Sequence, residues 1–334
     1  MDKRKLIIDT DPGIEDAIAI MLINASEVFD IKALTTVYGN ASLNQASLNT
    51  MYLTQLYSMN CPIAVGANRA MVKSVPFDEK QNGRNGLGNF RYPNPKRRLH
   101  DRWAWELIYE TALESDNELE ILTLGPLTNI AIALLKYPNL KDMIKTIYIR
   151  AGAATIGNVS PYAEFNIYQD PYAASVVLNS GINRIVMIDL DCCMDVYLSD
   201  SDCDRMLILK SKLGPMYEAL WKYKRKFQKE YIDRYFEVED NLKGRNIFFD
   251  AVASAVATDE TITGLKSVYV TCETQSSINY GQTVFDWNNR LNMNQNVELV
   301  RGVNQDRFKE MFQGSFSFYM NEKAADEVNK DAEE

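Results

Sequence analysis

The stretch KLIIDTDPGIEDAIAIML, residues 5–22, decides the fold and locates a candidate site. An apolar run ends in Asp9 and Asp11, a Pro-Gly pair then favours a tight turn, and Glu15 and Asp16 open a second apolar segment. This order predicts a buried strand, a turn and then a helix. Four carboxylates so close together repel one another, so the stretch also predicts a bound cation or a bound proton.

The same order of apolar run, turn and helical pattern recurs along most of the chain. Such alternation is typical of an α/β fold with a mostly parallel central sheet and helices on both faces, as in a Rossmann-like core. Several of the strands are apolar throughout, as expected when both faces of a sheet are covered. The expected strands are residues 5–11, 30–38, 62–66, 119–125, 146–152 and 184–191. The expected helices are residues 15–24, 43–57, 104–113, 129–136 and 171–178.

No shift in composition marks a domain boundary, so we expect residues 1–334 to form a single domain. Residues from about 204 to 245 are charged and have a helical pattern, which predicts a helical insertion or a lid over one end of the sheet. The last residues, from about 323 to 334, are polar and predict a frayed helix or tail.

Charge and composition exclude several classes of function. The formal net charge of −9 disfavours a nucleic-acid partner, and no apolar run is long enough to span a membrane. The five cysteines have no metal-type spacing, which indicates reduced thiols in a cytoplasmic protein, and the adjacent Cys192 and Cys193 are expected to be buried neighbours. The one histidine, His100, lies in a charged stretch and is expected at the surface. Most histidine-based catalysis and zinc chemistry are therefore disfavoured.

The carboxylates that end the first expected strand favour a hard divalent cation. Ligands of an open parallel sheet bind beyond the carboxyl ends of its strands, where Asp11 is expected. Glu15 and Asp16 would each be explained by a helix dipole alone, but Asp11 would not. The cluster favours calcium, with magnesium as the alternative. Asp250, after another apolar run, and the backbone carbonyl of Leu124, at a third strand-turn-helix junction, are further candidate ligands, although each also fits an ordinary helix cap or loop.

Residues 157–174, GNVSPYAEFNIYQDPYAA, contain groups suited to sugar hydroxyls. Glu164 and Asn166 flank Phe165 and would share one side of an extended stretch, with Asn158 on a turn nearby. Amides and carboxylates complement hydroxyls, which both donate and accept hydrogen bonds. Turn chemistry explains the same residues, so sugar binding is a hypothesis at this point.

Together these segments resemble the inosine-uridine preferring nucleoside hydrolase family. Its opening motif, D-x-D-P-G-x-D-D, is matched by DTDPGIED at 9–16. Its other marks are matched in order by VYGN at 37–40, NGLG at 85–88, LGPLTNIA at 124–131, GNVSPYAEFN at 157–166 and the isolated Asp250. One such motif would be weak, but the ordered set covers most of the chain.

The resemblance implies an α/β domain, a tightly bound calcium ion, and hydrolysis of the N-glycosidic bond of a ribonucleoside to ribose and a free base. It implies that Asp11 binds calcium and takes a proton from the attacking water. The other implied calcium ligands are Asp16, the carbonyl of Leu124 and Asp250, and the residues implied to hold the ribose are Glu15, Asn40, Asn158, Glu164 and Asn166. The implied partners are a small-molecule nucleoside and further copies of the chain, since the family often forms dimers or tetramers.

The sequence departs from the family pattern at the site itself. Glu15 stands where the family usually has Asp, and its reach is longer by about 1.5 Å. Phe249 precedes Asp250 where many members have a histidine that assists the departing base, and Asn82 stands where another histidine often lies. Arg150 replaces an apolar residue. A tyrosine, a chain of waters or Arg150 would then have to assist the base.

Two function hypotheses follow. The first is a calcium-dependent N-ribohydrolase, with loss of the histidine favouring pyrimidine nucleosides or a base that leaves easily. The alternative is a ribosyl- or nucleoside-binding protein of the same fold with altered or lost hydrolase activity, which Glu15 and Phe249 favour. A haloacid-type phosphatase is disfavoured because its D-x-D motif is not expected before Pro-Gly.

Overall fold

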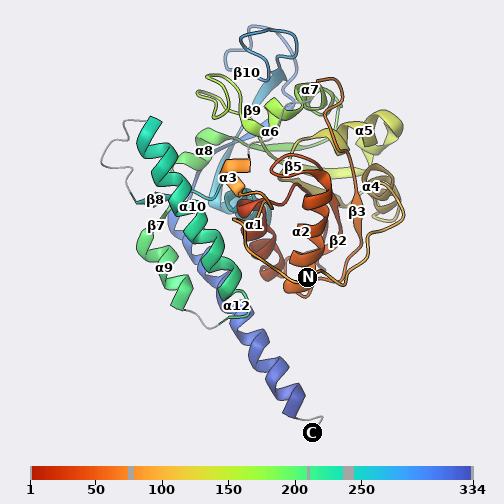
Figure 1. Ribbon diagram of the computed structural model, residues 1–334. Coiled ribbons are helices and arrows are strands. Elements are labelled where there is room, and N and C mark those ends of the chain that lie inside the picture. Colours follow the sequence, from red (N-terminus) through yellow and green to blue (C-terminus); the bar gives the residue numbers. More distant parts are fainter. Residues whose placement is uncertain (1, 74–78, 209–210, 236–243, 332–334) are drawn as a thin grey trace.

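The computed structural model describes residues 2–73, 79–208, 211–235 and 244–331 (Figure 1). Within them, one sheet has the strand order β10-β9-β11-β6-β5-β4-β1-β2-β3. Its strands are β1 Arg4–Thr10, β2 Phe29–Thr36, β3 Ile63–Val65, β4 Leu119–Thr123, β5 Ile144–Arg150, β6 Ile185–Ile188, β9 Thr263–Cys272, β10 Thr283–Asp286 and β11 Val297–Val303. All neighbours from β3 to β11 pair in parallel, whereas β9 and β10 are antiparallel additions. The predicted α/β class is confirmed.

Helices cover both faces of the sheet, and the apolar strands explain why. In β1, Leu6 and Ile8 pack into the core on one face while Ile7 packs into the core on the other. The first core includes α1 Ile14–Ala25, α11 Phe249–Thr258 and α12 Gln305–Asp331. The second includes α4 Ala104–Leu113, α5 Thr128–Lys136 and α7 Pro171–Leu178. The remaining helices are α2 Leu43–Leu56, α3 Glu79–Asn82, α6 Phe165–Gln169, α8 Leu190–Met194, α9 Asp200–Ile208 and α10 Gly214–Tyr235, with short 3-10 turns at η1 Pro138–Asp142 and η3 Glu260–Ile262.

The site is positioned by the strand order around β1. The chain leaves β1 for β2 and β3 on one side, and later adds β4, β5 and β6 on the other side. The connections after β1 and β4 therefore diverge, which leaves a crevice at their carboxyl ends. The N–H of Leu124 donates to the carbonyl of Asp9 at 2.8 Å, so the two strand ends stay adjacent.

The segment predicted as an insertion or lid forms α9 and α10, and a two-stranded pair of β7 Leu198–Ser199 with β8 Arg245–Asn246 brackets it. Residues 209–210 and 236–243 of this segment lie outside the described residues. The ring of Tyr217 on α10 meets that of Phe316 on α12 edge-on, with centroids 4.6 Å apart, so the two helices lie side by side (Figure 1). The prediction that residues from about 204 to 245 act as a lid stays a prediction.

The C-terminal helix α12 carries one apolar face. Phe308, Phe312, Phe316 and Tyr319 are buried and follow at helical spacing. The helix continues to Asp331, into the segment predicted as a frayed helix or tail, and residues 332–334 lie outside the described residues. In the part of the chain that the structure describes, none of the helices is long and apolar enough to cross a lipid bilayer.

Candidate active site

A cavity of about 50 Å³ lies at the carboxyl edge of the sheet. The residues that line it are Glu15, Asn40, Gln81, Asn82, Leu124, Arg150, Asn158, Glu164, Phe165, Asn166, Phe249 and Asp250. Every site residue predicted from the sequence is in this set except Asp11 and Asp16, and both of these hydrogen-bond to Asn40. Segments spread from residue 11 to residue 250 thus meet at one place.

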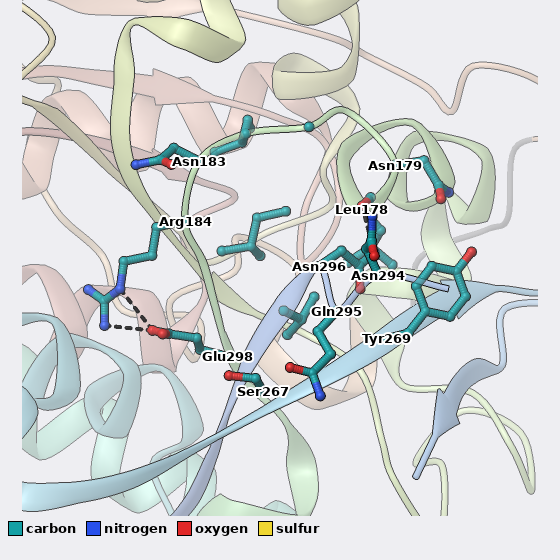
Figure 2. A pocket seen from close by; sticks show the side chains of 14 residues that line it. Leu178, Asn179, Asn183, Arg184, Ser267, Tyr269, Asn294, Gln295, Asn296 and Glu298 are labelled. Atoms are coloured by element: carbon teal, nitrogen blue, oxygen red, sulfur yellow. Dashed lines mark hydrogen bonds and ion pairs between the residues drawn. The ribbon is translucent and has the colours of Figure 1, made fainter. Parts of the chain in front are cut away.

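A larger cavity, of about 450 Å³, lies at the opposite edge, where β6 and β11 begin (Figure 2). Its charged groups are already paired, since Arg184 bridges Glu260 and Glu298 at 2.7 Å from each. The amide of Asn296 is likewise satisfied by backbone groups of Leu178 and Val270. Cavity size therefore does not identify the reactive site, because the residues of the family-like motifs line the smaller cavity.

Asp11 and Asp16 are fully buried and are held in place by Asn40. The backbone N–H of Asn40 donates to Oδ2 of Asp11 at 2.6 Å, and its side-chain amide donates to Oδ2 of Asp16 at 3.0 Å. The hydroxyl of Thr10 donates to Oδ1 of Asp16 at 2.6 Å. Oδ1 of Asp11 has no hydrogen-bond partner. Asp11 therefore has one anchored oxygen and one buried oxygen that is free to meet a water molecule or a cation.

Two glycines of the family-like motifs make room for this carboxylate. A Cβ atom at Gly39 would lie 2.1 Å from Oδ2 of Asp11, and one at Gly125 would lie 2.6 Å from Oδ1. Real Cβ atoms do not approach a carboxylate oxygen so closely, so neither position admits a side chain unless Asp11 moves. The segments VYGN and LGPLTNIA thus contribute backbone that wraps Asp11.

Burial and mutual repulsion raise the pKa values of the carboxylates at the site. Burial raises the pKa of Asp11 well above its ordinary value, and the charges of Asp16 and Asp250 raise it further. Burial also raises the pKa of Asp16, and burial and the charge of Asp16 raise the pKa of Asp250, against the opposing effect of Arg150. Beneath them, burial raises the pKa of Asp9 to about 7. The cluster therefore favours either a proton or added positive charge.

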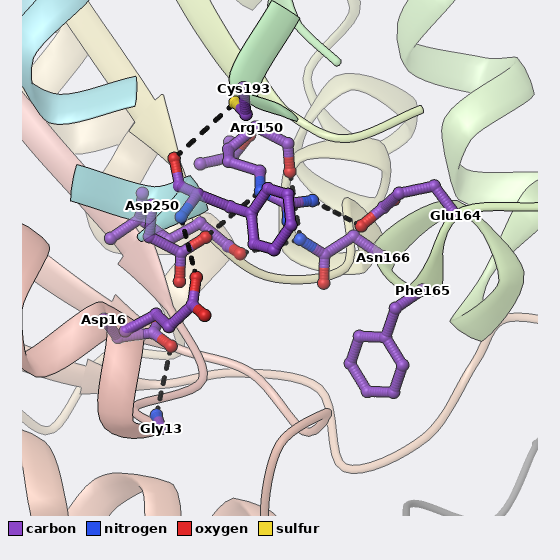
Figure 3. A network of polar contacts seen from close by, with 12 residues as sticks. Gly13, Asp16, Arg150, Glu164, Phe165, Asn166, Cys193 and Asp250 are labelled. Atoms are coloured by element: carbon purple, nitrogen blue, oxygen red, sulfur yellow. Dashed lines mark hydrogen bonds and ion pairs between the residues drawn. The ribbon is translucent and has the colours of Figure 1, made fainter. Parts of the chain in front are cut away.

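Arg150 lies between the carboxylates of Asp250 and Glu164 (Figure 3). Its Nε is 3.2 Å from Oδ1 of Asp250, its Nη1 donates to Oε1 of Glu164, and its guanidinium lies 4.9 Å from the ring centroid of Phe249. Arg150 is buried, so it is not an outward surface residue. Burial disfavours its charge, but Glu164 and Asp250 outweigh burial and raise the pKa of Arg150 above its ordinary value. The guanidinium can donate hydrogen bonds here, but it cannot give up a proton.

Residues 164–166 do not form the extended stretch in which Glu164 and Asn166 would share one side. Glu164 is the N-cap of α6, and its carboxylate accepts from the N–H of Ile167 at 3.2 Å. A carboxylate at this position satisfies an N–H group that has no partner within the helix, which favours the helical turn. Asn166 lies in the first turn of α6 and donates to the carbonyl of Leu124 at 2.7 Å. Both side chains still line the cavity.

Glu15 connects three helices. The N–H of Phe249, at the start of α11, donates to its Oε2 at 2.8 Å, and Lys224 of α10 forms an ion pair with its Oε1. Lys224 also lies 5.0 Å from the ring centroid of Phe248. Sequence reasoning missed Lys224, because nothing distinguishes it from the other cations of the charged segment around it. Both oxygens of Glu15 are engaged by protein groups in this structure.

Asn82 and Asn158 lie at different depths. Asn82 is buried, donates to Oδ1 of Asn40 at 2.9 Å and accepts from the N–H of Ile14 at 3.1 Å. Asn158 is exposed at the mouth of the cavity, where its side chain accepts from the N–H of Phe165 at 2.9 Å. Sequence reasoning did not single out the neighbouring Gln81, which carries no motif signal.

The remaining reactive residue types do not line the cavity. His100 is exposed, as expected. Cys192 and Cys193 are buried free thiols with their sulfur atoms 3.9 Å apart, as predicted for buried neighbours.

A metal site requires several donor atoms gathered at one place. Among the described residues, no three Asp, Glu, His or Cys side chains are gathered closely enough to hold a metal ion. The donors nevertheless fit a hard divalent cation in kind, because Asp11, Asp16, Asp250 and the Leu124 carbonyl supply only oxygen. The buried, unpartnered Oδ1 of Asp11 and the mutual repulsion of the carboxylates point the same way. Of the three carboxylates in this donor set, Asp250 forms an ion pair with Arg150.

Comparison with known proteins extends the likeness to the whole fold. A family model described as inosine-uridine preferring nucleoside hydrolase matches residues 6–310. The chain is 37% identical to Uridine nucleosidase 1 of Arabidopsis thaliana over 224 residues, 66% of each chain. It is 28% identical to the Non-specific ribonucleoside hydrolase RihC of Salmonella newport over 313 residues, 94% of this chain and 97% of that protein. The structure of a Purine-Preferring Ribonucleoside Hydrolase from Gardnerella vaginalis matches with a TM-score of 0.87 and 27% identity, over 95% of this chain and 99% of that one.

Proposed function

Since the chain belongs to the inosine-uridine preferring nucleoside hydrolase family and is therefore a nucleoside hydrolase, we propose that it cleaves ribonucleosides to ribose and a free base with the help of a calcium ion. The observation that carries the proposal is the buried carboxylate of Asp11, with one oxygen anchored and the other unpartnered. It lies beside a cavity lined by amides and carboxylates, which suit the hydroxyls of a sugar.

Asp11, Asp16, Asp250 and the carbonyl of Leu124 would hold the calcium ion. When bound, calcium supplies a Lewis acid that favours ionisation of water and orients sugar hydroxyls. The all-oxygen donor set matches its ligand preference.

Asp11 would act as the general base. The hydrogen bond from Asn40 fixes one carboxylate oxygen, so that Oδ1 keeps a constant direction toward the attacking water. Burial and the neighbouring carboxylates raise the pKa of Asp11, and the added positive charge of a cation would favour the ionised form that accepts a proton.

The sugar would lie against the carboxylates and amides of the cavity. Breaking the bond between the sugar and the base builds positive charge on the ribose, as in other glycoside hydrolysis. Negative groups fixed around the ribose would stabilise that charge. The residues proposed to hold the ribose are Glu15, Asn40, Asn158, Glu164 and Asn166.

The base would lie toward Asn82, Arg150 and Phe249. None of the three can donate a proton as a histidine would, because Phe249 is apolar, the amide of Asn82 does not ionise and Arg150 retains its proton. Arg150 can still stabilise a departing base by hydrogen bonding. This arrangement favours pyrimidine nucleosides or a base that leaves easily, such as a pyridinium.

The proposal is tested by release of reducing sugar from ribonucleosides, deoxyribonucleosides and nicotinamide riboside, first with calcium and then with a chelator. We expect release from at least one ribosyl compound, loss of release in chelator, and recovery when calcium is restored. A preparation of Asp11→Asn serves as the blank for contaminating hydrolases. Absence of release from every compound in calcium would refute the proposal.

A second candidate function is a nucleoside-binding protein of the same fold that has altered or lost hydrolase activity. Its support is that Phe249 and Lys224 occupy both oxygens of Glu15, and Arg150 engages Asp250. Calorimetric titration with the same compounds separates the two functions. Saturable binding without product favours the binding protein, whereas sugar release favours the hydrolase.

We further propose a cytoplasmic protein that forms a homodimer or homotetramer, with residues from about 204 to 245 acting as a lid. The free buried cysteines suit a reducing compartment, and Lys224 carries α10 to the edge of the cavity. Light scattering coupled to size-exclusion chromatography measures the assembly.

A further inference from the structure

Arg150 is a buried cation in direct contact with a proposed calcium ligand. Its side chain is 6% exposed, and the side chains of Asp250 and Glu164 are 8% and 1% exposed. The guanidinium reaches Asp250 through Nε and Glu164 through Nη1, so it neutralises part of the negative charge on both (Figure 3). Because its pKa is raised, this positive charge is permanent.

A divalent ion and the guanidinium would compete for the same carboxylate. Oδ1 of Asp250 already lies 3.2 Å from Nε of Arg150. An ion held by Asp11, Asp16 and Asp250 would also be repelled by the fixed positive charge, and repulsion is strong where water is excluded. The ion therefore gains less free energy on binding than it would in the same cluster without Arg150.

We propose that Arg150 is a built-in counter-cation that weakens divalent-ion binding and so sets the calcium affinity of the site. This inference rests on the proposed use of calcium, but it does not require that the protein hydrolyse a nucleoside. Arg150 keeps the carboxylates of Asp250 and Glu164 compensated when the ion is absent. The consequence is a site that binds calcium more weakly than the same carboxylates would without Arg150.

The experiment is a calorimetric titration of calcium chloride into the full chain after chelator treatment. Arg150→Met removes the charge and keeps a side chain of similar length. We expect it to bind calcium at least about tenfold more tightly than the unmodified protein. Arg150→Lys keeps a positive charge near these carboxylates, so it should bind calcium more weakly than Arg150→Met does.

Arg184→Met is the matched control. Arg184 also bridges two carboxylates, Glu260 and Glu298, but at the opposite edge of the sheet. Arg184→Met changes the net charge of the protein by the same amount as Arg150→Met. Because Arg184 lies far from the proposed calcium ligands, this variant should leave calcium affinity unchanged. Equal or weaker calcium binding by Arg150→Met, or equal tightening by Arg184→Met, would overturn the proposal.

Thermal unfolding with and without calcium gives a second readout. Loss of Arg150 leaves two buried carboxylates uncompensated, so Arg150→Met should unfold at a lower temperature without calcium and gain more from calcium than the unmodified protein does. Failure of both Arg150→Met and Arg150→Gln to fold at saturating calcium would mean that calcium cannot replace the guanidinium, and would also overturn the proposal. Sugar release is measured separately, so tightened calcium binding without release would sink the proposed activity alone.

Discussion

The contact between Glu15 and Lys224 can be tested by shortening one side chain. Glu15→Asp restores the residue type usual in the family and withdraws the carboxylate by one bond, about 1.5 Å. The shortened carboxylate cannot reach both the ammonium of Lys224 and the N–H of Phe249, which Glu15 accepts at 2.8 Å. We therefore expect Glu15→Asp to loosen α10 from α1 and α11 and to destabilise the protein.

The size of the effect follows from burial. The side chains of Lys224 and Glu15 are 16% and 15% exposed, so their pair lies between exposed pairs, worth up to about 1 kcal/mol, and buried pairs, whose breakage costs about 3–5 kcal/mol. We expect a coupling free energy of about 2 kcal/mol. With an unfolding entropy of about 2 cal/mol/K per residue, this lowers Tm by about 3 °C in a chain of 334 residues.

The assay is urea and thermal unfolding of Glu15→Gln, Lys224→Met and the double variant, which together isolate the pairwise free energy. Lys222→Met is the control, because Lys222 pairs with Glu218 at the surface of the same helix and should change stability by less than about 0.5 kcal/mol. A coupling below about 0.5 kcal/mol, with Glu15→Asp as stable as the unmodified protein, would refute this interpretation. Glu15 would then be free for a sugar hydroxyl, as the family resemblance implies.

Three further predictions concern other parts of the molecule. Asp11→Asn should lower the rate of sugar release by about 10²–10⁴-fold, the usual contribution of a general base, and a loss below tenfold in steady-state kinetics would exclude that role. Asp189, whose Oδ1 accepts from the N–H of Cys192 at 3.0 Å while Oδ2 has no partner, has a pKa raised by burial to about 6. Because the folded state holds this proton more tightly than the unfolded state, the ionised carboxylate destabilises the fold as pH rises through about 6. Asp189→Asn should thus raise the free energy of unfolding near pH 7.5 by up to about 3 kcal/mol and have no effect below about pH 4, and an equal gain at both pH values would contradict the assignment. Arg4→Met should lower the free energy of unfolding by about 3 kcal/mol, because it leaves the carboxylate of Glu120, whose side chain is 3% exposed, without its cation. Urea unfolding measures this loss, and the double variant with Glu120→Gln should recover part of it.

The first half of the fold and the location of the site follow from local sequence. Strand β1 is apolar at successive positions because both faces of the sheet are covered, and that pattern is visible without a structure. The turn after β1 and the family-like glycines are also local signals, since Gly39 and Gly125 must leave room for Asp11. The strands β9, β10 and β11 were not predicted. Strand β9 is largely exposed in its first half and pairs antiparallel with both β10 and β11, so it lacks the continuous apolar run of the buried parallel strands.

The electrostatic partners within the site were decided only by the tertiary structure. Glu15 and Lys224 are 209 positions apart, and Arg150 and Asp250 are 100 positions apart. Hydrophobic periodicity predicts which face of an element is buried, but it does not predict which cation meets which carboxylate. That choice depends on how α10 and α11 pack over the end of the sheet. Burial of an unpaired charge there would raise the free energy of the folded state, which favours packing that pairs each cation with a carboxylate.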